Sequence, residues 1–461
     1  MYCNKKPSNL VLIGLSAASL LLSTSGQAAT APASAPETIF QIYNLAVEND
    51  PLLSAAVYVF NASKENTEYA RGGLYPDINL IAELGRTRED VVVTDGVGAS
   101  GLTTFNSNKA LLRLKQPLYR KDLFSEIDIA DAESQAANSE YKLAKQNLIM
   151  RLTEAYFAVL YAVDNRTFAN AEEHAIGRQL KNIKRRYKVG KSTITDLQEA
   201  QASHDLATAE VIIAQNDYED SLEGLTQLTG LEHSNIAGLS ADFVPGKLEH
   251  TDLDYWVKLA EDNNKKLQAD RHTIQALRYE IENKNSGHYP KLDLVARYRL
   301  EESGGRYGDS ETDDRSIMLR LDIPIYQGGR VSSKSRTANI NLNEAIHRLR
   351  NTHRSVMRET RKSYRTVISS IKRISALKQA VLSAETALAM ITKGYKVGTR
   401  TNTDVLYAQR EVYKVHRDYS ADKYKYTINF ILLKNLTGTL SQNDLAFIDK
   451  WFVASGFNNK K

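Results

Sequence analysis

The chain has 461 residues, and its 60 Lys and Arg side chains nearly balance its 55 Asp and Glu side chains, for a formal net charge of +5. Charges of both signs are interspersed as on solvated helix faces, so we expect no nucleic-acid partner. The single cysteine, Cys3, excludes a disulfide framework. Stability must therefore come from packing or from assembly.

The N-terminus has the pattern of a secretory signal peptide, which we expect to span residues 1–28. Lys5 and Lys6 precede an apolar run from Leu10 to Leu22, and small residues lead to a cleavage site after Ala28. The apolar run is short for a transmembrane helix, and no other run of about 18 apolar residues occurs. We predict an exported chain without a membrane-spanning helix.

Strict alternation of apolar and polar residues predicts four strands with one buried face each, at about 76–87, 108–118, 290–301 and 315–326. Polar, glycine-rich segments join the members of each pair, at 88–107 and 301–314. A soluble sheet would show the same alternation. The export signal, and the lack of helical segments placed to cover the apolar face, favour strands that cross a membrane.

Four strands cannot close a barrel, because the smallest natural barrels have about eight. Open strand edges are not tolerated in lipid. If these strands span a membrane, several chains must therefore share one barrel. Its lumen would be polar and rather basic because of the inward-facing cationic residues, which are Arg113, Lys115, Arg297, Arg299 and Arg320.

Two exceptionally long helices are predicted at about 120–188 and 330–393, because these segments are rich in helix-forming residues and almost free of Gly and Pro. Each is followed by a return helix, at about 195–227 and 403–436. Apolar residues form narrow stripes, which are typical of coiled-coil packing. The helical pattern alone fits an elongated coiled-coil spacer as well as a tube.

A Tyr-Lys-Val-Gly motif ends both long helices, with Val189 and Gly190 in the first copy and Val397 and Gly398 in the second. The residues that follow each motif recur at the same offset, which predicts two copies of one structural unit. We place these units at 29–230 and 253–438. The segments 231–252 and 439–461 are expected to form a girdle around the middle of the helices.

If several chains form a tube, one residue per chain becomes a ring. Asp404 would then form a carboxylate ring at the narrow end, which favours cations. Arg400 is placed to pair with Asp196 on the neighbouring hairpin, and Tyr395 to donate a hydrogen bond there, so that the tip stays closed. The alternative is that both aspartates, each with the threonine before it, only cap the return helices.

Motifs for catalysis are absent from the sequence, which has no Gly-x-Ser-x-Gly, His-Glu-x-x-His, phosphate loop or Gly-x-Gly-x-x-Gly. The nine histidines are scattered without metal-ligand spacing. We therefore expect neither an enzyme nor a bound cofactor or metal.

Taken together, the chain resembles the TolC family of outer-membrane channel-tunnels along essentially its whole mature length. The resemblance rests on the two Tyr-x-Val-Gly turns, on Tyr75-Pro76 and Tyr289-Pro290 at the strand starts, and on Gln116-Pro117-Leu118-Tyr119 against Ile323-Pro324-Ile325-Tyr326-Gln327-Gly328-Gly329. It implies an α+β membrane protein and a homotrimer. Three chains would form a twelve-stranded transmembrane β-barrel, four strands from each chain, that continues into a long periplasmic twelve-helix α-barrel with a mixed equatorial domain.

The resemblance also implies a place and a function. The chain would lie in the outer-membrane lipid of a Gram-negative bacterium, with a large periplasmic part. It would join inner-membrane RND or ABC transporters and periplasmic adaptor (membrane fusion) proteins, to expel drugs or to secrete proteins by type I secretion. The exposed turn residues Val189, Gly190, Val397 and Gly398 are candidate adaptor contacts, or ordinary turn residues.

By position, Asp404 matches an aspartate of the family's entrance ring, and Asp196, Tyr395 and Arg400 match the contacts that keep the entrance shut. Tyr407 stands where the best-known member has a second ring aspartate. We therefore expect a ring of three carboxylates that multivalent cations block weakly.

An alternative from another class of protein function is a trimeric adhesin or structural stalk, with a barrel anchor and a coiled coil. A stalk, however, has no need of a helix that returns toward the membrane, nor of two near-copies that pack into a closed tube.

Overall fold

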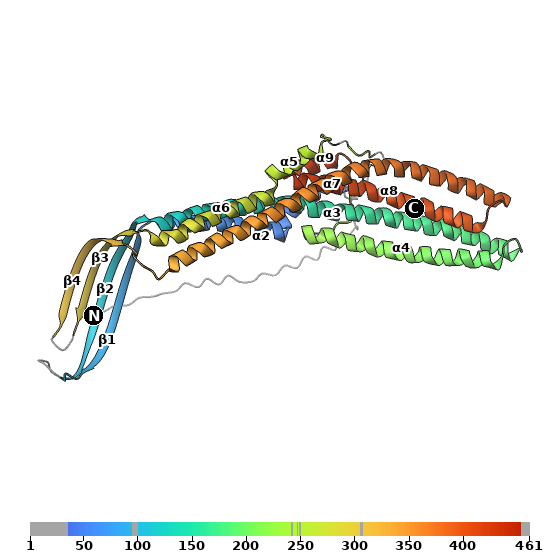
Figure 1. The fold of residues 1–461 in the computed structure, drawn as a ribbon. Helices are drawn as coiled ribbons and strands as arrows, with labels where there is room; N and C mark the ends of the chain where they lie inside the picture. The colour runs from blue at the N-terminus through green and yellow to red at the C-terminus, as the bar shows by residue number, and fades with distance from the viewer. Residues whose placement is uncertain are drawn as a thin grey trace, which may run out of the picture. The chain divides into compact units, whose positions relative to one another are not determined.

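A computed structural model describes residues 36–94, 100–240, 243–246, 248, 250–304 and 308–452. The expected signal peptide, residues 1–28, lies outside these ranges. Within the body that begins at Pro36, long helices run side by side, and a sheet continues from one end of them (Figure 1).

The same order of elements occurs twice along the chain: a helix pair, two strands, a long helix and a return helix. The first set is α1 Ile39–Asn49, α2 Pro51–Gly72, β1 Asp77–Val91, β2 Gly101–Arg120, α3 Lys121–Lys188 and α4 Ile194–Thr229. The second set is α5 Leu253–Asn263, α6 Lys265–Asn285, β3 Lys291–Ser303, β4 Ser310–Asp322, α7 Arg330–Val397 and α8 Asn402–Leu436. A 3-10 turn, Ser286–His288, precedes β3, and α9 Gln442–Asp449 follows α8.

All four strands run further into the connecting segments than the alternation suggested. Most of the segment 88–107, expected as a loop, belongs to strands β1 and β2, and Arg88 pairs with Thr104 there. Polar and β-branched residues extend a strand as well as apolar ones do when one face meets water. Strand β4 likewise begins early, at Ser310 within the expected loop 301–314, but it ends at Asp322 rather than at 326. Pro324 has no N–H to donate to a neighbouring strand.

The four strands form one antiparallel sheet in the order β1-β2-β3-β4. Their register gathers apolar side chains on one face, where Leu80, Leu84, Ile317 and Leu319 are between 66% and 86% exposed. The sheet extends beyond the helices, which leave both of its faces uncovered (Figure 1). An uncovered apolar sheet face of this size indicates contact with lipid or with another chain.

Helices α3 and α7 have 68 residues each, about 100 Å at 1.5 Å per residue. Helix α4 packs along α3 and α8 packs along α7, so each pair is a long hairpin. Ala200, Ala207 and Ala214 on α4 are buried and one heptad apart, a spacing that keeps small side chains on one seam and lets the helix backbones approach. Ile176 of α3, Ala207 and Leu406 of α8 form one apolar cluster, which joins the two hairpins.

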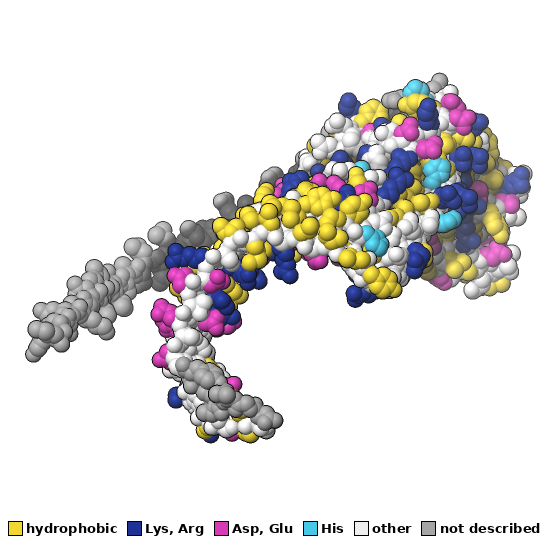
Figure 2. Space-filling model, turned by 60° about the vertical axis from the view of Figure 1, so that its left-hand side comes forward, with side chains coloured by type: hydrophobic (Ala, Val, Ile, Leu, Met, Phe, Trp, Pro, Cys, Tyr) yellow, Lys and Arg dark blue, Asp and Glu magenta, His cyan; other side chains and the backbone are white. Residues whose placement is uncertain are grey.

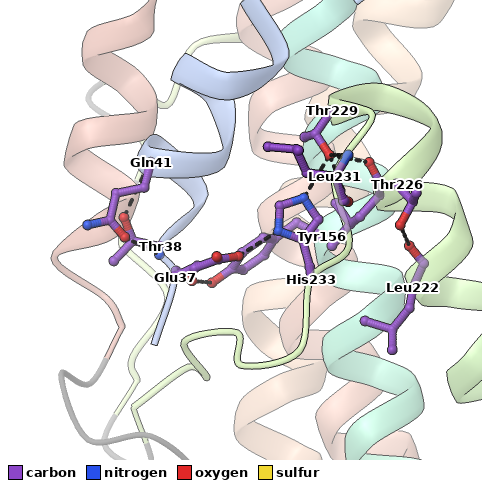
Figure 3. Close-up of polar contacts among 10 residues, drawn as sticks. Glu37, Thr38, Gln41, Tyr156, Leu222, Thr226, Thr229, Leu231 and His233 are labelled. Carbon is purple, nitrogen blue, oxygen red and sulfur yellow. Dashed lines mark hydrogen bonds and ion pairs between the residues drawn. The ribbon is translucent and has the colours of Figure 1, made fainter. Parts of the chain in front are cut away.

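The largest apolar cluster lies midway along the helices and joins α1, α2, α3, α4, α8 and α9. At its edge the Tyr156 hydroxyl donates to the carbonyl oxygens of Glu37 and Ala237, at 3.2 and 2.6 Å. The His233 ring lies between the Glu37 carboxylate and the Thr229 hydroxyl, at 2.6 and 2.7 Å (Figure 3). These bonds tie the segment after α4 to the residues before α1.

Among the described residues, one helix is long and apolar enough to cross a membrane. It is α7, with an 18-residue window of mean hydropathy 1.2, of which only 6% is buried. No 18-residue stretch of α7 is free of polar residues, so the expectation that no second apolar run of this length occurs is not contradicted, and the absence of a membrane-spanning helix stays a prediction. A single helix of this kind is weak evidence for a membrane span, because exposed apolar residues on a long helix also suit packing between helices.

Candidate functional site: the helix tips and the sheet face

The two helical hairpins turn at the end far from the sheet (Figure 1). Gly190 has φ 71° and Gly398 has φ 86°, in the left-handed region where glycine alone is free of Cβ strain. The N–H of Gly190 donates to the Tyr187 carbonyl at 2.9 Å, and the N–H of Gly398 donates to the Tyr395 carbonyl at 3.2 Å. The expectation that these glycines end the long helices is confirmed. The valines before them are exposed, Val189 by 68% and Val397 by 77%.

Both return helices begin with the same capping box. Thr193 accepts a hydrogen bond from the Asp196 N–H at 3.0 Å, and the Asp196 carboxylate accepts one from the Thr193 N–H at 3.0 Å. Thr401 and Asp404 repeat these bonds at 3.2 and 2.9 Å. The caps are therefore these threonines, two residues before those considered from the sequence, and the aspartates occupy the third helical position. The pattern Thr-x-x-Asp was the signal that locates the cap.

The capping boxes lower the pKa of both aspartates. The Thr193 N–H does most to lower the pKa of Asp196, with smaller contributions from neighbouring hydroxyls and the charge of Arg186. The Thr401 N–H does most to lower the pKa of Asp404, helped by the Thr401 hydroxyl and the charge of Arg400. Both side chains are thus carboxylates well below neutral pH, as an anionic ring requires.

Among the residues of the predicted lock, the structure shows a partner that sequence reasoning missed. The Arg186 guanidinium, on the last turn of α3, lies 5.2 Å from the ring centroid of Tyr395, near the end of α7. Such cation–π contacts stabilise by about 0.5–1 kcal/mol at exposed sites. Within the described part of one chain, Arg400 makes no ion pair with Asp196; its side chain packs over Gly394, where an added Cβ would lie 2.8 Å from Arg400 Cγ.

Two further hydrogen bonds connect the hairpins close to the tips. Thr403 on α8 donates to the Glu199 carboxylate on α4 at 2.7 Å. Gln179 on α3 donates to the side-chain oxygen of Asn402 at 2.7 Å. No motif marks these pairs, because each joins residues that are far apart in the sequence. They hold the two tips of one chain together.

At the other end, the strand register brings the five predicted lumen residues to one face of the sheet, opposite the exposed apolar one. Carboxylates share that face, and several pair with the cations. Lys115 lies 3.3 Å from Asp293, and Arg299 lies 3.3 Å from Glu301. The expectation of a rather basic lining therefore needs correction: cations and carboxylates are interleaved. The alternating pattern predicted which residues share a face of the sheet. It could not predict which carboxylates lie next to the cations, because that depends on the register between strands.

Across the described residues, no group of three or more His, Cys, Asp or Glu side chains is arranged to hold a metal ion.

A family model described as outer membrane efflux protein matches residues 42–231 and 256–439. The outer membrane protein TolC of Vibrio cholerae is 33% identical over 413 residues, which are 89% of this chain and 92% of that protein. The alkaline protease secretion protein AprF of Pseudomonas aeruginosa is 30% identical over 89% of this chain and 86% of that protein.

Solved structures share the fold at lower identity. The outer membrane protein VceC of Vibrio cholerae superposes with a TM-score of 0.75 and 18% identity, over 87% of this chain and 96% of that one. The CmeC outer membrane channel of Campylobacter jejuni gives a TM-score of 0.76 and 16% identity, over 90% and 89%.

Proposed function

The chain belongs to the outer membrane efflux protein family, and from this premise we propose that three copies form one export duct across the outer membrane. The duct expels drugs or secretes proteins, as the names of the efflux and secretion relatives suggest. Inner-membrane RND or ABC transporters supply the energy, and periplasmic adaptor proteins connect them to the helix tips.

The observation that carries this proposal is the unfinished sheet. Strands β1 and β4 each pair with one neighbour only within the described chain, and one face of the sheet is apolar and exposed. Lipid tolerates neither unpaired strand edges nor four-stranded barrels. Joining β4 of one copy to β1 of the next satisfies both edges, and three copies give twelve strands.

The helices support the same assembly. Leu206, Ile212 and Ile213 on α4 are between 53% and 67% exposed, as are Ile340, Leu382 and Met390 on α7. Figure 2 shows apolar side chains in a continuous area on the helices next to the sheet. A large apolar area on a helix face marks an interaction surface. In the trimer these faces pack against the hairpins of the adjacent copy.

The helix tips form the gated entrance in this proposal. Three Asp404 side chains make the carboxylate ring, which selects cations. Asp196, Tyr395 and Arg400 form the closed-state lock, with Arg400 reaching Asp196 of the adjacent copy. The exposed turns with Val189, Gly190, Val397 and Gly398 are the surface where an adaptor docks and releases the lock.

The relatives named are channels and secretion proteins rather than enzymes or adhesins, which favours the duct over a barrel-anchored stalk. The fold adds a physical argument. In each half a return helix runs the length of the hairpin beside the long helix. A stalk would gain nothing from this second layer, while a closed helical tube needs four helices from each chain.

Cysteine cross-linking tests the shared barrel, since Cys3 lies in the expected signal peptide and the mature chain would have no other thiol. Leu80→Cys on β1 is combined in turn with Cys at Ile317, Leu319 or Leu321 on β4, all on the same face. At least one combination should give covalent dimers and trimers under oxidation. Leu80→Cys with Cys at Leu300 on the inner strand β3 is the control that should not. Native mass spectra with only single chains would refute the assembly.

A further inference from the structure

One row across the sheet differs from the rest of its polar face. The register aligns Asn79 with Arg113, Arg113 with Arg297, and Arg297 with Ser316. Two arginines therefore stand directly opposite each other on neighbouring strands, and neutral polar residues flank them. Both arginines are exposed in the single chain. Like charges placed directly opposite destabilise a strand pair. The two arginines therefore lower the stability of the β2–β3 pairing at this row.

The other cations of this face are placed beside carboxylates. Lys109 lies 3.3 Å from Glu83, Lys115 lies 3.3 Å from Asp293, and Arg299 lies 3.3 Å from Glu301. Arg320 makes no ion pair with another described residue, but it stands opposite Asp293 in the register. In the part of the chain that the structure describes, Arg113 and Arg297 make no ion pair, and Arg297 donates a weak hydrogen bond to the sulfur of Met318 at 3.7 Å.

The rows on either side contain apolar residues. Ile81 and Leu111 lie in one of them, and Val295 and Met318 in the other. The nearest carboxylates are one row away and already engaged: Asp77 accepts from Asn79 at 2.7 Å, and Asp314 lies 3.9 Å from Arg299. Among the described residues of these three rows, each carboxylate already has a polar partner, so the charge of the guanidinium pair is not neutralised locally.

We propose that this row, the Arg113–Arg297 row, is a binding site for multivalent oxyanions in the barrel lumen. The inference rests on the proposed trimer, in which three copies place six guanidiniums at one level without a carboxylate between them. The next side chains along these strands are the apolar ones of the lipid-facing surface, so the arginines point to the lumen. A guanidinium binds phosphate or carboxylate oxygens through two parallel hydrogen bonds.

The duct then carries opposite charges at its two ends. The Asp404 ring favours cations at the tips, and the Arg113–Arg297 row favours anions within the sheet. A multivalent anion that enters from the sheet side meets the arginines first and stays bound in the lumen. One that enters from the tip side must first pass the carboxylate ring. Block by anions should therefore depend on the side of addition.

Planar bilayer recording with inorganic pyrophosphate as the probe tests the site. To keep the lock from limiting the current, all channels carry Arg400→Ser. Pyrophosphate added on the sheet side should reduce the current of this channel. When Arg113→Gln and Arg297→Gln are added, the pyrophosphate concentration that blocks half of the current should rise about tenfold or more, because the charge-assisted hydrogen bonds are lost. Lys109→Gln, on the same face but two rows away and beside Glu83, is the matched control and should change it little.

Equal block in the Arg400→Ser channel and in the channel with both Gln substitutions would overturn the inference. An effect of Lys109→Gln as large as that of the two Gln substitutions would overturn it as well. Each single Gln variant is recorded as well, so that a failure of the double variant to assemble leaves the comparison intact. Since the substitutions remove a like-charge contact, the trimers should resist heat at least as well as the parent. Folded trimers without any current would refute the proposed function itself, whereas currents insensitive to pyrophosphate refute only this site.

Discussion

The Arg186 guanidinium lies over the ring of Tyr395, 5.2 Å from its centroid, and joins the end of α3 to the end of α7. The same guanidinium contributes to the lowered pKa of Asp196 on the return helix α4. One cation thus connects three of the four helix ends at the tip. The sequence suggested a role for the Tyr395 hydroxyl in the proposed lock, whereas the contact that the structure shows is made by the aromatic ring.

We predict that Arg186→Gln raises the single-channel conductance, because the α7 end is then less firmly held against α3. Tyr395→Leu should act in the same direction. Tyr395→Phe separates the two parts of the side chain: it keeps the ring, so the conductance should stay close to that of the wild type. A large increase in the Phe variant, equal to that of Tyr395→Leu, would show that the hydroxyl carries the contact instead.

Asp404→Asn should reduce cation selectivity, because it removes one charge from each chain of the proposed trimer while the side-chain shape stays similar. Tyr407 is 69% exposed one turn further along α8. Tyr407→Asp should therefore add a second carboxylate ring and strengthen block by a trivalent cation. Reversal potentials in a salt gradient and titration with a trivalent cation measure the two effects. Tight block of the wild-type channel would contradict the single ring.

The pH dependence follows from the lowered pKa values of Asp196 and Asp404. A carboxyl group whose folded pKa is depressed stabilises the fold above its unfolded pKa, and this contribution is lost as the pH falls through the folded value. The ordinary value is 3.8. Cation selectivity and closure should therefore stay constant from neutral pH down to the region of 3.8 and decline only below it. A midpoint well above that value, in reversal potentials recorded across pH, would contradict the capping-box account.

The buried Asp50 gives a prediction about stability. Burial raises its pKa, but the hydrogen bonds from Arg151 and the Leu53 N–H outweigh burial, and the pKa lies below its ordinary value. Arg151 reaches the carboxylate at 2.7 and 3.0 Å. Arg151→Met leaves this buried charge with one partner fewer. The change should destabilise the fold by about 1–3 kcal/mol, at the low end for a buried pair because Arg151 is partly exposed.

Thermal unfolding in detergent, followed by circular dichroism, measures the effect of Arg151→Met. Arg358→Met, on a side chain that is 75% exposed and paired with the neighbouring Glu359, is the control and should change little. Asp50→Asn combined with Arg151→Met should recover part of the loss, because no buried charge remains. Equal melting temperatures for Arg151→Met and the wild type would contradict the role of the pair.

Much of the fold was accessible from the sequence, because strict alternation and long glycine-free segments have few structural alternatives. The four strands, the two long helices and both turn glycines follow from these patterns. Strand ends were less accessible, since polar residues such as Thr104 continue a strand that faces water. The N-caps were placed two residues late because Thr195 and Thr403 imitate the capping residues beside them.

The contacts at the tips could not be predicted in the same way. Arg186 lies in a basic stretch that looks like an ordinary helix C-terminus, and only the packing of α3 against the second hairpin brings it to Tyr395. The correction at the sheet has the same origin. Periodicity shows that Arg113 and Arg297 share a face, while the register between strands decides that they stand opposite each other and that Lys115 meets Asp293.

The central claim is a gated duct whose lock lies at the helix tips. Single-channel conductance of the purified trimer in a planar bilayer, beside an Arg400→Ser variant, tests it most directly. We predict small, cation-selective currents for the wild type and clearly larger currents for the variant, with Lys396→Ser on the same turn as a control that leaves the conductance unchanged. Equally large currents in all three would remove the lock from the tips, and well-folded trimers without current would contradict the duct.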